Sequence, residues 1–302
     1  MTRYSRILLT GCNGQVGNAL RTKLAPLGNV LATDRSSLDL ASPDSIRALI
    51  RDCKPGLIVN AAAYTAVDRA ETEAGLAMAV NGTAPGVLAE DAKRLGAVLV
   101  HYSTDYVFDG TKSAAYSETD TPNPLSVYGK TKLSGEQAIQ AVGGAHYILR
   151  TSWVYAAAGA NFLNTMLRLA RERPELRIVD DQTGAPTWAR AIAEMTVRLL
   201  PAVADGKDPH YGLYHMTATG TVSWLGFAQA IFAAAQKIDR SITIPRLIPI
   251  TTAEYPLPAQ RPANSRLDTT RLEKIFGIKP DPWPAMLEQC LRDKAPGGRF
   301  AV

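Results

Sequence analysis

Three glycines in the segment TGCNGQVG constrain the fold more than any other feature of this chain. Gly11, Gly14 and Gly17 follow the apolar run RILLT and open the helical pattern QVGNALRTKL. Glycine at these positions permits a tight turn between strand and helix and lets the backbone approach a pyrophosphate. The N-terminus of the following helix offers free amides and a partial positive charge. The segment therefore predicts a dinucleotide-binding turn.

Apolar runs and helical patterns alternate through the first half of the chain. We predict strands at 6–11, 29–34, 56–63, 97–105 and 146–152, with helices between them. Strands that are apolar along their whole length are typical of a parallel sheet covered on both faces. We therefore expect an α/β fold, a Rossmann doubly wound parallel sheet with a smaller C-terminal lobe.

The pattern is less regular after Ser152. Helices are expected at 161–174, 189–203 and 224–238, a strand at 176–182, and prolines cluster near the end. We expect the Rossmann domain to comprise residues 1–152 with later returns at 176–200 and 222–246. The smaller lobe should then comprise residues 153–175, 201–221 and 247–302.

Composition argues against several classes of protein. Lys and Arg number 33 against 28 Asp and Glu, a net charge of +5 without any basic run, so no nucleic-acid partner is expected. No apolar run is long enough to span a bilayer, and the N-terminus lacks a signal-peptide pattern. Three scattered cysteines, Cys12, Cys53 and Cys290, indicate free thiols in a reducing compartment. We expect a cytoplasmic enzyme or binding protein.

Asp34 ends the second predicted strand, about 20 residues beyond the glycine turn, where a carboxylate can bind the ribose of a dinucleotide. The alternative is an ordinary carboxylate in a turn. Asp34 favours NAD through the 2′-hydroxyl, whereas the neighbouring Arg35 could meet the 2′-phosphate of NADP. The sequence leaves NADPH and NADH both open.

A hydroxyl, a phenol and an amine form the predicted reaction centre. Tyr128 precedes Lys132 by four residues, which share one face of a helix. Ser103, Thr104 and Asp105 stand at the carboxyl end of a strand, where open parallel sheets bind ligands. A nearby cation would lower the tyrosine pKa from near 10 by roughly 1–3 units and make the phenol a proton donor. The alternatives are a surface pair and a threonine bonded to local backbone.

These motifs resemble, in order, the extended short-chain dehydrogenase/reductase family. The resemblance rests on the glycine turn, NAA at 60–62, the Ser/Thr-bearing strand and Tyr128-x-x-x-Lys132. The stretches HYSTDYVFDG, VYGKTKLSGE, LRTSWVY, DDQTGAPT and RPANSRLDT further resemble the nucleotide-sugar reductases of that family, from residue 7 to about 276. The resemblance implies a C-terminal lobe that binds a nucleotide sugar. It also implies reduction by NAD(P)H of a keto group at position four of a dTDP-linked sugar, the last step toward a precursor of cell-envelope polysaccharide.

The resemblance also assigns residues to the two ligands. In that family Lys132 holds the nicotinamide ribose, Asp39 and Leu40 flank the adenine, and Arg261 suits the diphosphate because guanidinium bonds phosphate bidentately. The cofactor-binding residues it implies are Gly11, Asn13, Gly14, Gln15, Val16, Gly17, Asp34, Arg35, Asp39, Leu40, Ala61, Ala62, Ala63, Tyr64, Tyr128 and Lys132. The substrate-binding residues are Val67, Ser103, Thr104, Asp105, Tyr106, Trp153, Asn161, Gln182 and Arg261. Tyr106 and Trp153 could instead fill the core, and Arg261 could be a solvated surface residue.

One position departs from the family pattern. Some members carry a glutamate two residues after the third glycine that binds magnesium at a dimer interface, and here that residue is Ala19. A methyl group cannot ligate a hard cation. We therefore expect no metal site, and a monomer or weak homodimer.

Two other functions fit the same fold. The first is a nucleotide-sugar epimerase or dehydratase; dehydratases add an acidic pair beside the catalytic threonine, whereas Thr104 is followed by Asp105 and Tyr106. The second is a non-catalytic NADP-binding regulatory subunit, such as the relatives that partner methionine adenosyltransferase. Such a subunit need not keep the complete set Thr104, Tyr128 and Lys132, so its presence favours an enzyme.

Overall fold

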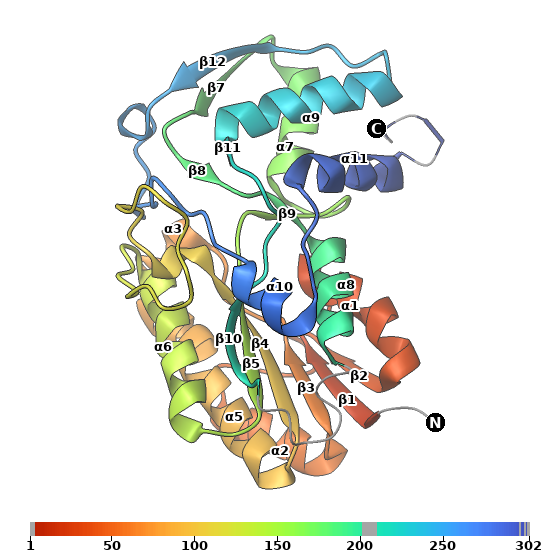
Figure 1. Ribbon diagram of the computed structural model, residues 1–302, viewed down its shortest axis with the longest axis vertical. Coiled ribbons are helices and arrows are strands. Elements are labelled where there is room, and N and C mark those ends of the chain that lie inside the picture. The colour runs from red at the N-terminus through yellow and green to blue at the C-terminus, as the bar shows by residue number, and fades with distance from the viewer. Residues whose placement is uncertain (1–3, 201–209, 296, 299, 301–302) are drawn as a thin grey trace.

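A six-stranded parallel sheet forms the centre of the larger of two lobes (Figure 1). This computed structural model describes residues 4–200, 210–295, 297, 298 and 300. The strands lie in the order β10-β5-β4-β3-β1-β2 and every neighbouring pair is parallel. Their bounds are β1 Tyr4–Thr10, β2 Gly28–Thr33, β3 Leu57–Asn60, β4 Val98–Thr104, β5 His146–Thr151 and β10 Gly212–His215. The order reverses beside β1, which confirms the predicted doubly wound α/β fold.

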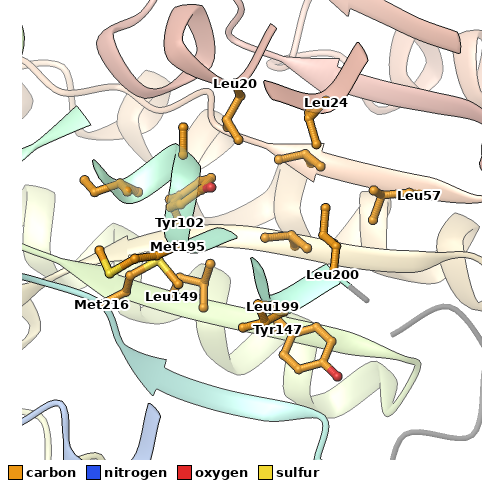
Figure 2. Packing of buried hydrophobic residues seen from close by; sticks show 14 of the residues in the cluster. Leu20, Leu24, Leu57, Tyr102, Tyr147, Leu149, Met195, Leu199, Leu200 and Met216 are labelled. Atoms are coloured by element: carbon orange, nitrogen blue, oxygen red, sulfur yellow. The ribbon is translucent and has the colours of Figure 1, made fainter. Parts of the chain in front are cut away.

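Helices cover both faces of this sheet. One face carries α1 (Gln15–Leu24) and α8 (Ala189–Leu199), which pack against each other. Figure 2 shows their core, where Leu20 and Leu24 meet Leu57, Tyr102 and Leu149 from the strands. The other face carries α2 (Pro43–Cys53), α5 (Ala84–Leu95) and α6 (Val127–Val142) over a second apolar cluster. The nearly continuous apolar strands are thus buried on both sides, as the sequence predicted.

The smaller lobe is built on a separate core. It contains α7 (Phe162–Glu172), α9 (Trp224–Ile238) and α11 (Trp283–Lys294), with β7 (Glu175–Val179) pairing β12 (Arg246–Ile250) in parallel. Two short pairs lie nearer the larger lobe: β6 (Val154–Tyr155) with β9 (Thr187–Trp188), and β8 (Thr183–Gly184) with β11 (Val222–Ser223). Helix α10 (Thr270–Phe276) returns the chain to the larger lobe beside β10 (Figure 1).

Short helical segments complete the chain. They are the 3₁₀ turns η1 Ala25–Leu27, η3 Asp105–Val107 and η5 Thr252–Glu254, the helices α3 Val67–Ala70 and α4 Ala74–Met78, and the π-helical turn η2 Ala79–Thr83. The three cysteines are buried free thiols. Within the described ranges, no helix combines the length and apolar character needed to cross a membrane.

Packing places four elements differently from the sequence-based division. We expected residues 247–302 in the smaller lobe, but Leu272 and Phe276 of α10 pack into the core of the larger lobe. We expected residues 222–246 to return to the sheet, but α9 packs against α7 and α11 because apolar residues on several of its faces fill the second core. We expected β7 to belong to the Rossmann domain, but it pairs with β12 and its buried residues join the core of the smaller lobe. We expected residues 212–215 in the smaller lobe, but as β10 they extend the sheet beside β5. Of the stretch 201–221, residues 201–209 lie outside the described part of the chain.

Candidate active site

The glycine turn joins β1 to α1 as predicted. Gly11 has φ +68°, and a Cβ there would lie 2.6 Å from the Cα of Ala62. A Cβ on Gly17 would lie 2.1 Å from the carbonyl oxygen of Gly11. Gly14 is less confined, since its Cβ would meet only that same oxygen, at 3.3 Å. Gly14 is the N-cap of α1 and makes no side-chain cap, so the first amides of this helix are available to an anion.

Asp34 lies beside this turn. Its Oδ2 accepts a hydrogen bond of 2.7 Å from Asn13 Nδ2, and its Oδ1 accepts hydrogen bonds from Ser36 and Ser37. The hydrogen bonds from Ser36 are the main reason that the pKa of Asp34 falls to about 2. The carboxylate is therefore charged and fixed next to the phosphate turn, where a ribose is expected, and Arg35 next to it is exposed.

The remaining predicted cofactor residues lie in α1 and in the segments that follow β2 and β3. Ala61, Ala62 and Ala63 follow β3, and the backbone of Ala62 touches Gly11. Gln15 donates from Nε2 to the carbonyl oxygen of Val154 at 3.3 Å, which ties α1 to the segment below the smaller lobe. Val16 and Leu40 pack against the two cores of the sheet, and Asp39 accepts from the amide of Ala41.

Asn81 holds the backbone at Tyr64 in place, although it was not among the residues predicted from the sequence. Its Oδ1 accepts from the amide of Tyr64 at 2.8 Å, and its Nδ2 donates to the carbonyl oxygen of Tyr64 at 3.0 Å. Nδ2 also donates to Thr131 on α6. The Tyr64 hydroxyl donates to Glu73 at 2.6 Å. Asn81 lies in the π-helical turn, and its interruption of the helical pattern was the available signal.

Tyr128 occupies the first turn of α6 next to Thr104. Ser126 caps this helix by accepting from the amide of Gly129, and a Cβ on Gly129 would lie 2.2 Å from the carbonyl oxygen of Tyr106. The start of α6 is thereby held against the segment that follows β4. Burial raises the pKa of Tyr128 to about 12 and outweighs the hydrogen bond between Tyr128 and Thr104. The phenol therefore keeps its proton at neutral pH.

The direction of this pKa shift corrects one expectation. We predicted that Lys132 lowers the pKa of Tyr128, yet Lys132 is not among the groups that shift it. Its Nζ donates to the carbonyl oxygen of Tyr102 at 2.6 Å and lies 3.2 Å from His101 Nε2. The spacing of four residues does place both side chains on the inner face of α6, but the long lysine chain turns toward β4.

Asp105 is a second titratable group at this strand end. Thr104 Oγ1 donates to its Oδ1 at 2.9 Å, whereas its Oδ2 and the hydroxyl of Ser103 have no hydrogen-bond partner among the described residues. Burial raises the pKa of Asp105 to about 7, against hydrogen bonds from Ser265 and Thr104. Ser265 comes from the C-terminal segment, a contact that sequence reasoning missed.

Arg261 reaches the site from the C-terminal segment and is not a solvated surface residue. Its guanidinium forms two hydrogen bonds with Asp68, at 2.8 Å and 3.1 Å, and its side chain is 17% exposed. Asp68 follows Val67 in α3, so this ion pair joins the first third of the chain to its end. The side chain of Arg261 also bonds Tyr106, whose ring meets Tyr128 edge to face at 5.8 Å.

Two stacked indoles form the side of the site nearer the smaller lobe. Trp153 has φ +47° and stacks on Trp224 with ring centroids 3.5 Å apart. Gln182 accepts from Trp224 Nε1 at 3.2 Å and donates to Thr252 at 3.0 Å. Asn161 instead caps α7 and bonds the carbonyl oxygen of Ala156, so its amide is committed to local backbone. Trp224 was not predicted.

The residues described hold no group of three or more His, Cys, Asp and Glu side chains arranged to bind a metal ion. Ala19 packs partly buried against the core that α1 covers. Its methyl group supplies no ligand. The indifference to magnesium expected from Ala19 stays a prediction.

Comparison with known proteins identifies close relatives. Residues 5–295 match the family model described as the RmlD substrate binding domain. The chain is 49% identical over 293 residues to dTDP-4-dehydrorhamnose reductase of Burkholderia thailandensis, covering 95% of this chain and 98% of that one. It is 44% identical to the reductase of that name from Escherichia coli K12, covering 95% and 97%. A solved dTDP-4-dehydrorhamnose reductase from Bacillus anthracis, in complex with NADP, superposes with TM-score 0.89 at 33% identity, over 97% of this chain and 100% of that one.

Proposed function

The chain belongs to the RmlD family of dTDP-4-dehydrorhamnose reductases, and we propose that Thr104, Tyr128 and Lys132 form its catalytic centre. Its reaction is the NAD(P)H-dependent reduction of the 4-keto group of dTDP-4-dehydro-L-rhamnose to dTDP-L-rhamnose, the last step of dTDP-rhamnose biosynthesis. The observation that carries the residue assignment is the contact between Tyr128 and Thr104 at the carboxyl end of β4.

The glycine turn and Asp34 fit a dinucleotide. Free amides at the start of α1 suit the pyrophosphate, and the charged carboxylate of Asp34 suits a ribose hydroxyl. When bound, NADH or NADPH supplies the hydride that reduces the carbonyl carbon. Because Arg35 stands exposed beside Asp34, both dinucleotides remain candidates.

Tyr128 is the proton donor. Its pKa of about 12 keeps the phenol protonated at neutral pH, so the proton is present when the substrate oxygen gains charge. Thr104 interacts with the phenol, and its hydroxyl can turn its one proton from Asp105 to the carbonyl oxygen, which fixes the carbonyl for proton transfer. The phenolate that remains is stabilised by the ammonium of Lys132 if that side chain turns back along α6.

Arg261 binds the diphosphate of the substrate by exchanging partners. Its two hydrogen bonds to Asp68 have the fork geometry that a phosphate also accepts. The diphosphate would displace the carboxylate of Asp68, which is 36% exposed. Tyr106 bonds Arg261, and Val67 precedes Asp68 in α3; these two residues, with Asp105, Trp153 and Gln182, are the further substrate contacts that we propose.

The two alternative functions are less well supported. A dehydratase would carry an acidic pair beside Thr104, and the position after Asp105 holds Tyr106 instead. A regulatory subunit would not need Thr104, Tyr128 and Lys132 together.

We further propose a monomer or weak homodimer located in the cytoplasm. Nucleotide cofactors and sugar nucleotides are available in that compartment, and the three free thiols are compatible with it.

Turnover tests the assignment. The purified protein is mixed with NADPH or NADH and dTDP-4-dehydro-L-rhamnose, and cofactor oxidation is followed together with formation of dTDP-L-rhamnose. Tyr128→Phe keeps the ring and removes one hydroxyl, so turnover should fall by about 10²–10⁴-fold while the fold survives. Near-parental turnover in this variant would remove Tyr128 from the role of proton donor.

A further inference from the structure

A row of buried polar groups lies beneath α6, and the mechanism above does not use it. The sheet register pairs Thr10 with Asn60 and Asn60 with His101, so the three side chains lie side by side on β1, β3 and β4. Their exposed fractions are 1%, 1% and 0%. Lys132, itself 1% exposed, reaches down from α6 to the end of this row. Buried polar groups are nearly always hydrogen-bonded, so the bonds can be followed along the row.

The contacts run without a break from β1 to α6. Thr10 Oγ1 donates to Asn60 Oδ1 at 2.6 Å, and Asn60 Nδ2 lies 2.9 Å from His101 Nδ1. His101 Nε2 lies 3.2 Å from Lys132 Nζ, which also donates to the carbonyl oxygen of Tyr102 at 2.6 Å. His101 is therefore the one side chain of this row that touches Lys132.

His101 is a neutral imidazole. Burial, reinforced by the charge of Lys132, holds its pKa well below 6.5. A neutral imidazole has one nitrogen that donates and one that accepts. The proton on His101 must therefore sit either on Nδ1, toward Asn60, or on Nε2, toward Lys132.

Each position of the proton matches one charge state of Lys132. An ammonium can only donate, so Nε2 must accept, Nδ1 must carry the proton, and Asn60 must turn its oxygen to His101. A neutral amine can accept from a protonated Nε2, and Nδ1 then accepts from the Asn60 nitrogen. In the structure, Asn60 Oδ1 accepts from Thr10 and Asn60 Nδ2 faces His101 Nδ1. This orientation corresponds to the arrangement in which Lys132 is a neutral amine. In both arrangements every group of the row has a partner.

The other charged groups around Lys132 do not fix its protonation state. Burial lowers the pKa of Lys132 to about 8, against the field of Glu136 one turn further along α6. Glu136 is itself paired with Arg150 on β5 through hydrogen bonds of 2.6 Å and 2.9 Å. Tyr128 lies one turn before Lys132, and Asp105 contacts Thr104 at the end of β4. The cations and carboxylates nearby are thus largely paired with one another.

We propose that His101 is a positioning residue whose neutral ring carries its proton on Nδ1 or on Nε2, so that it can hold the Lys132 side chain beside β4 both as an ammonium and as an amine. The inference rests on the proposed role of Lys132. When Lys132 gives a proton to the Tyr128 phenolate, an N–H bond breaks and the phenol O–H bond forms. The His101 ring then releases its Nδ1 proton to water and takes one from water at Nε2, the amine accepts a hydrogen bond from that N–H, and water returns a proton to the amine before the next turnover.

Kinetics across pH test this role. His101→Leu should lower kcat by up to about 100-fold through misplacement of Lys132, with little change in KM. The alkaline limb of the kcat profile should move to lower pH, because an ammonium facing an apolar side chain has lost its acceptor. His101→Gln, whose amide can accept or donate near the position of Nε2, should restore most of kcat.

The control is Thr196→Val, which removes a buried hydrogen bond of 2.6 Å to Tyr102 on the opposite face of the sheet. It should leave the pH profile unchanged. If His101→Leu lowers kcat without moving the profile and Gln gives no rescue, His101 only fills space and the proposal is wrong.

A second measurement needs no turnover and no change at His101. The chain has four histidines, so ring nitrogen chemical shifts of ¹⁵N-histidine-labelled parent protein with bound NADPH can be followed across pH. His101 should remain neutral and change tautomer as Lys132, whose pKa burial lowers to about 8, loses its proton. The change should be absent in Lys132→Met. An imidazolium signal from His101, or one tautomer throughout, overturns the proposal even if Tyr128 proves to be the proton donor.

Discussion

The hydroxyl of Thr104 donates a hydrogen bond of 2.9 Å to Oδ1 of Asp105, which is 2% exposed. The threonine that we propose as catalytic is therefore held by a carboxyl group that is itself nearly removed from water. Burial raises the pKa of Asp105 from 3.8 to about 7, so the folded protein binds a proton there that the unfolded chain releases at lower pH.

The first prediction concerns this group and stability. Because the folded pKa is raised, the protein binds more protons than the unfolded chain between about pH 4 and 7, and the contribution of Asp105 to stability is lost as pH rises through that window. Asp105→Asn cannot ionise. The variant should therefore gain stability relative to the parent as pH rises. The difference between their free energies of unfolding, variant minus parent, should increase by up to about 4 kcal/mol from pH 4 to 7.

Urea unfolding at several pH values measures this difference. Asp109→Asn is a useful comparison, because hydrogen bonds lower the pKa of Asp109, so its difference from the parent should stay nearly constant from about pH 5 to 7 and change in the opposite direction mainly below about pH 4. A pH-independent difference for Asp105→Asn would mean that Asp105 has an ordinary pKa.

The second prediction concerns the cofactor. A Cβ on Gly14 would make one tight contact, 3.3 Å to the carbonyl oxygen of Gly11, so Gly14→Val should fold with a small shift of the turn while its branched side chain stands where the pyrophosphate is expected. Titration with NADPH and NADH should show binding lost while the thermal unfolding midpoint stays close to that of the parent. Gly17→Ala is the contrast, since its Cβ would lie 2.1 Å from a backbone oxygen and should destabilise the fold. Parental cofactor affinity in Gly14→Val would refute the assignment.

The sequence predicted those features that depend on local pattern. The glycine turn needs a tight bend and close backbone approach, and both appear in the contacts of Gly11 and Gly17. Tyr128 was found because Lys132 follows it by four residues, a spacing that puts both on one face of a helix. Residues joined across long stretches of sequence, such as Asp68 with Arg261 and Trp153 with Trp224, escaped prediction as pairs because no local pattern encodes them.

Lys132 shows a different limit. Spacing along a helix fixes the direction of Cα–Cβ bonds, but four further rotatable bonds let the ammonium choose among several partners. Here it lies on the carbonyl oxygen of Tyr102 and beside His101. The position of β10 was missed because GLYH is too short to be distinguished from a loop, and its place depends on a free sheet edge beside β5.

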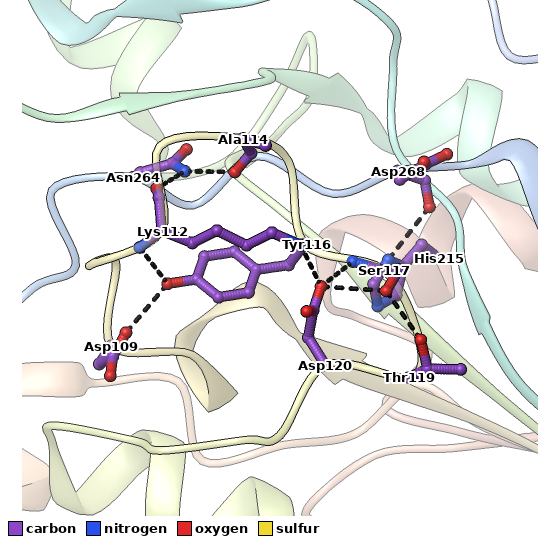
Figure 3. A network of polar contacts seen from close by, with 10 residues as sticks. All are labelled: Asp109, Lys112, Ala114, Tyr116, Ser117, Thr119, Asp120, His215, Asn264 and Asp268. Carbon is purple, nitrogen blue, oxygen red and sulfur yellow. Dashed lines mark hydrogen bonds and ion pairs between the residues drawn. The ribbon is translucent and has the colours of Figure 1, made fainter.

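The polar network around Tyr116 illustrates how the C-terminal segment is attached (Figure 3). The Tyr116 hydroxyl donates to Asp109 at 2.9 Å, and Asn264 donates to the carbonyl oxygens of Lys112 and Ala114. These bonds anchor the loop after β4 to the residues that follow Arg261. Since Asn264 and Ser265 are adjacent, the same attachment places Ser265 against Asp105. The motif RPANSRLDT therefore has structural reasons for several of its polar residues.

The third prediction concerns magnesium. Ala19 offers no ligand, so turnover should be indifferent to a chelator, and the molar mass from light scattering should be the same with and without magnesium. Ala19→Glu tests whether a carboxylate at this position is enough to create a metal-dependent dimer. A magnesium-dependent increase in mass of the parent protein would show that the inference from Ala19 fails.

The fourth prediction concerns the ion pair at the substrate side. Arg261→Ala should weaken binding of dTDP-L-rhamnose by about 2–5 kcal/mol, because a charged partner of the diphosphate is lost and Asp68 remains nearby. Asp68→Asn should not weaken binding of the sugar nucleotide, because the Arg261 guanidinium then has no ion pair with a carboxylate to break. Calorimetry with the sugar nucleotide and, separately, with NADPH distinguishes the two ligands. Equal loss of NADPH affinity in Arg261→Ala would indicate a disturbed fold, and unaltered sugar-nucleotide binding would make the pair with Asp68 purely structural.

The last prediction separates the charge of Lys132 from its hydrogen bonds. Lys132→Met removes the ammonium that stabilises the phenolate, so turnover at neutral pH should fall further than in Tyr128→Phe, and cofactor affinity should fall as well. Residual activity should stay level to higher pH than in the parent, because the phenol of Tyr128, with a pKa of about 12, keeps the proton that it donates. Lys132→Arg restores a permanent charge but cannot give up its proton, so it should recover cofactor affinity more than turnover. Steady-state NADPH oxidation across pH, combined with cofactor titration, measures both effects. If Lys132→Arg recovers turnover and affinity equally, the role of Lys132 is charge alone, and proton transfer from its ammonium is not part of the cycle.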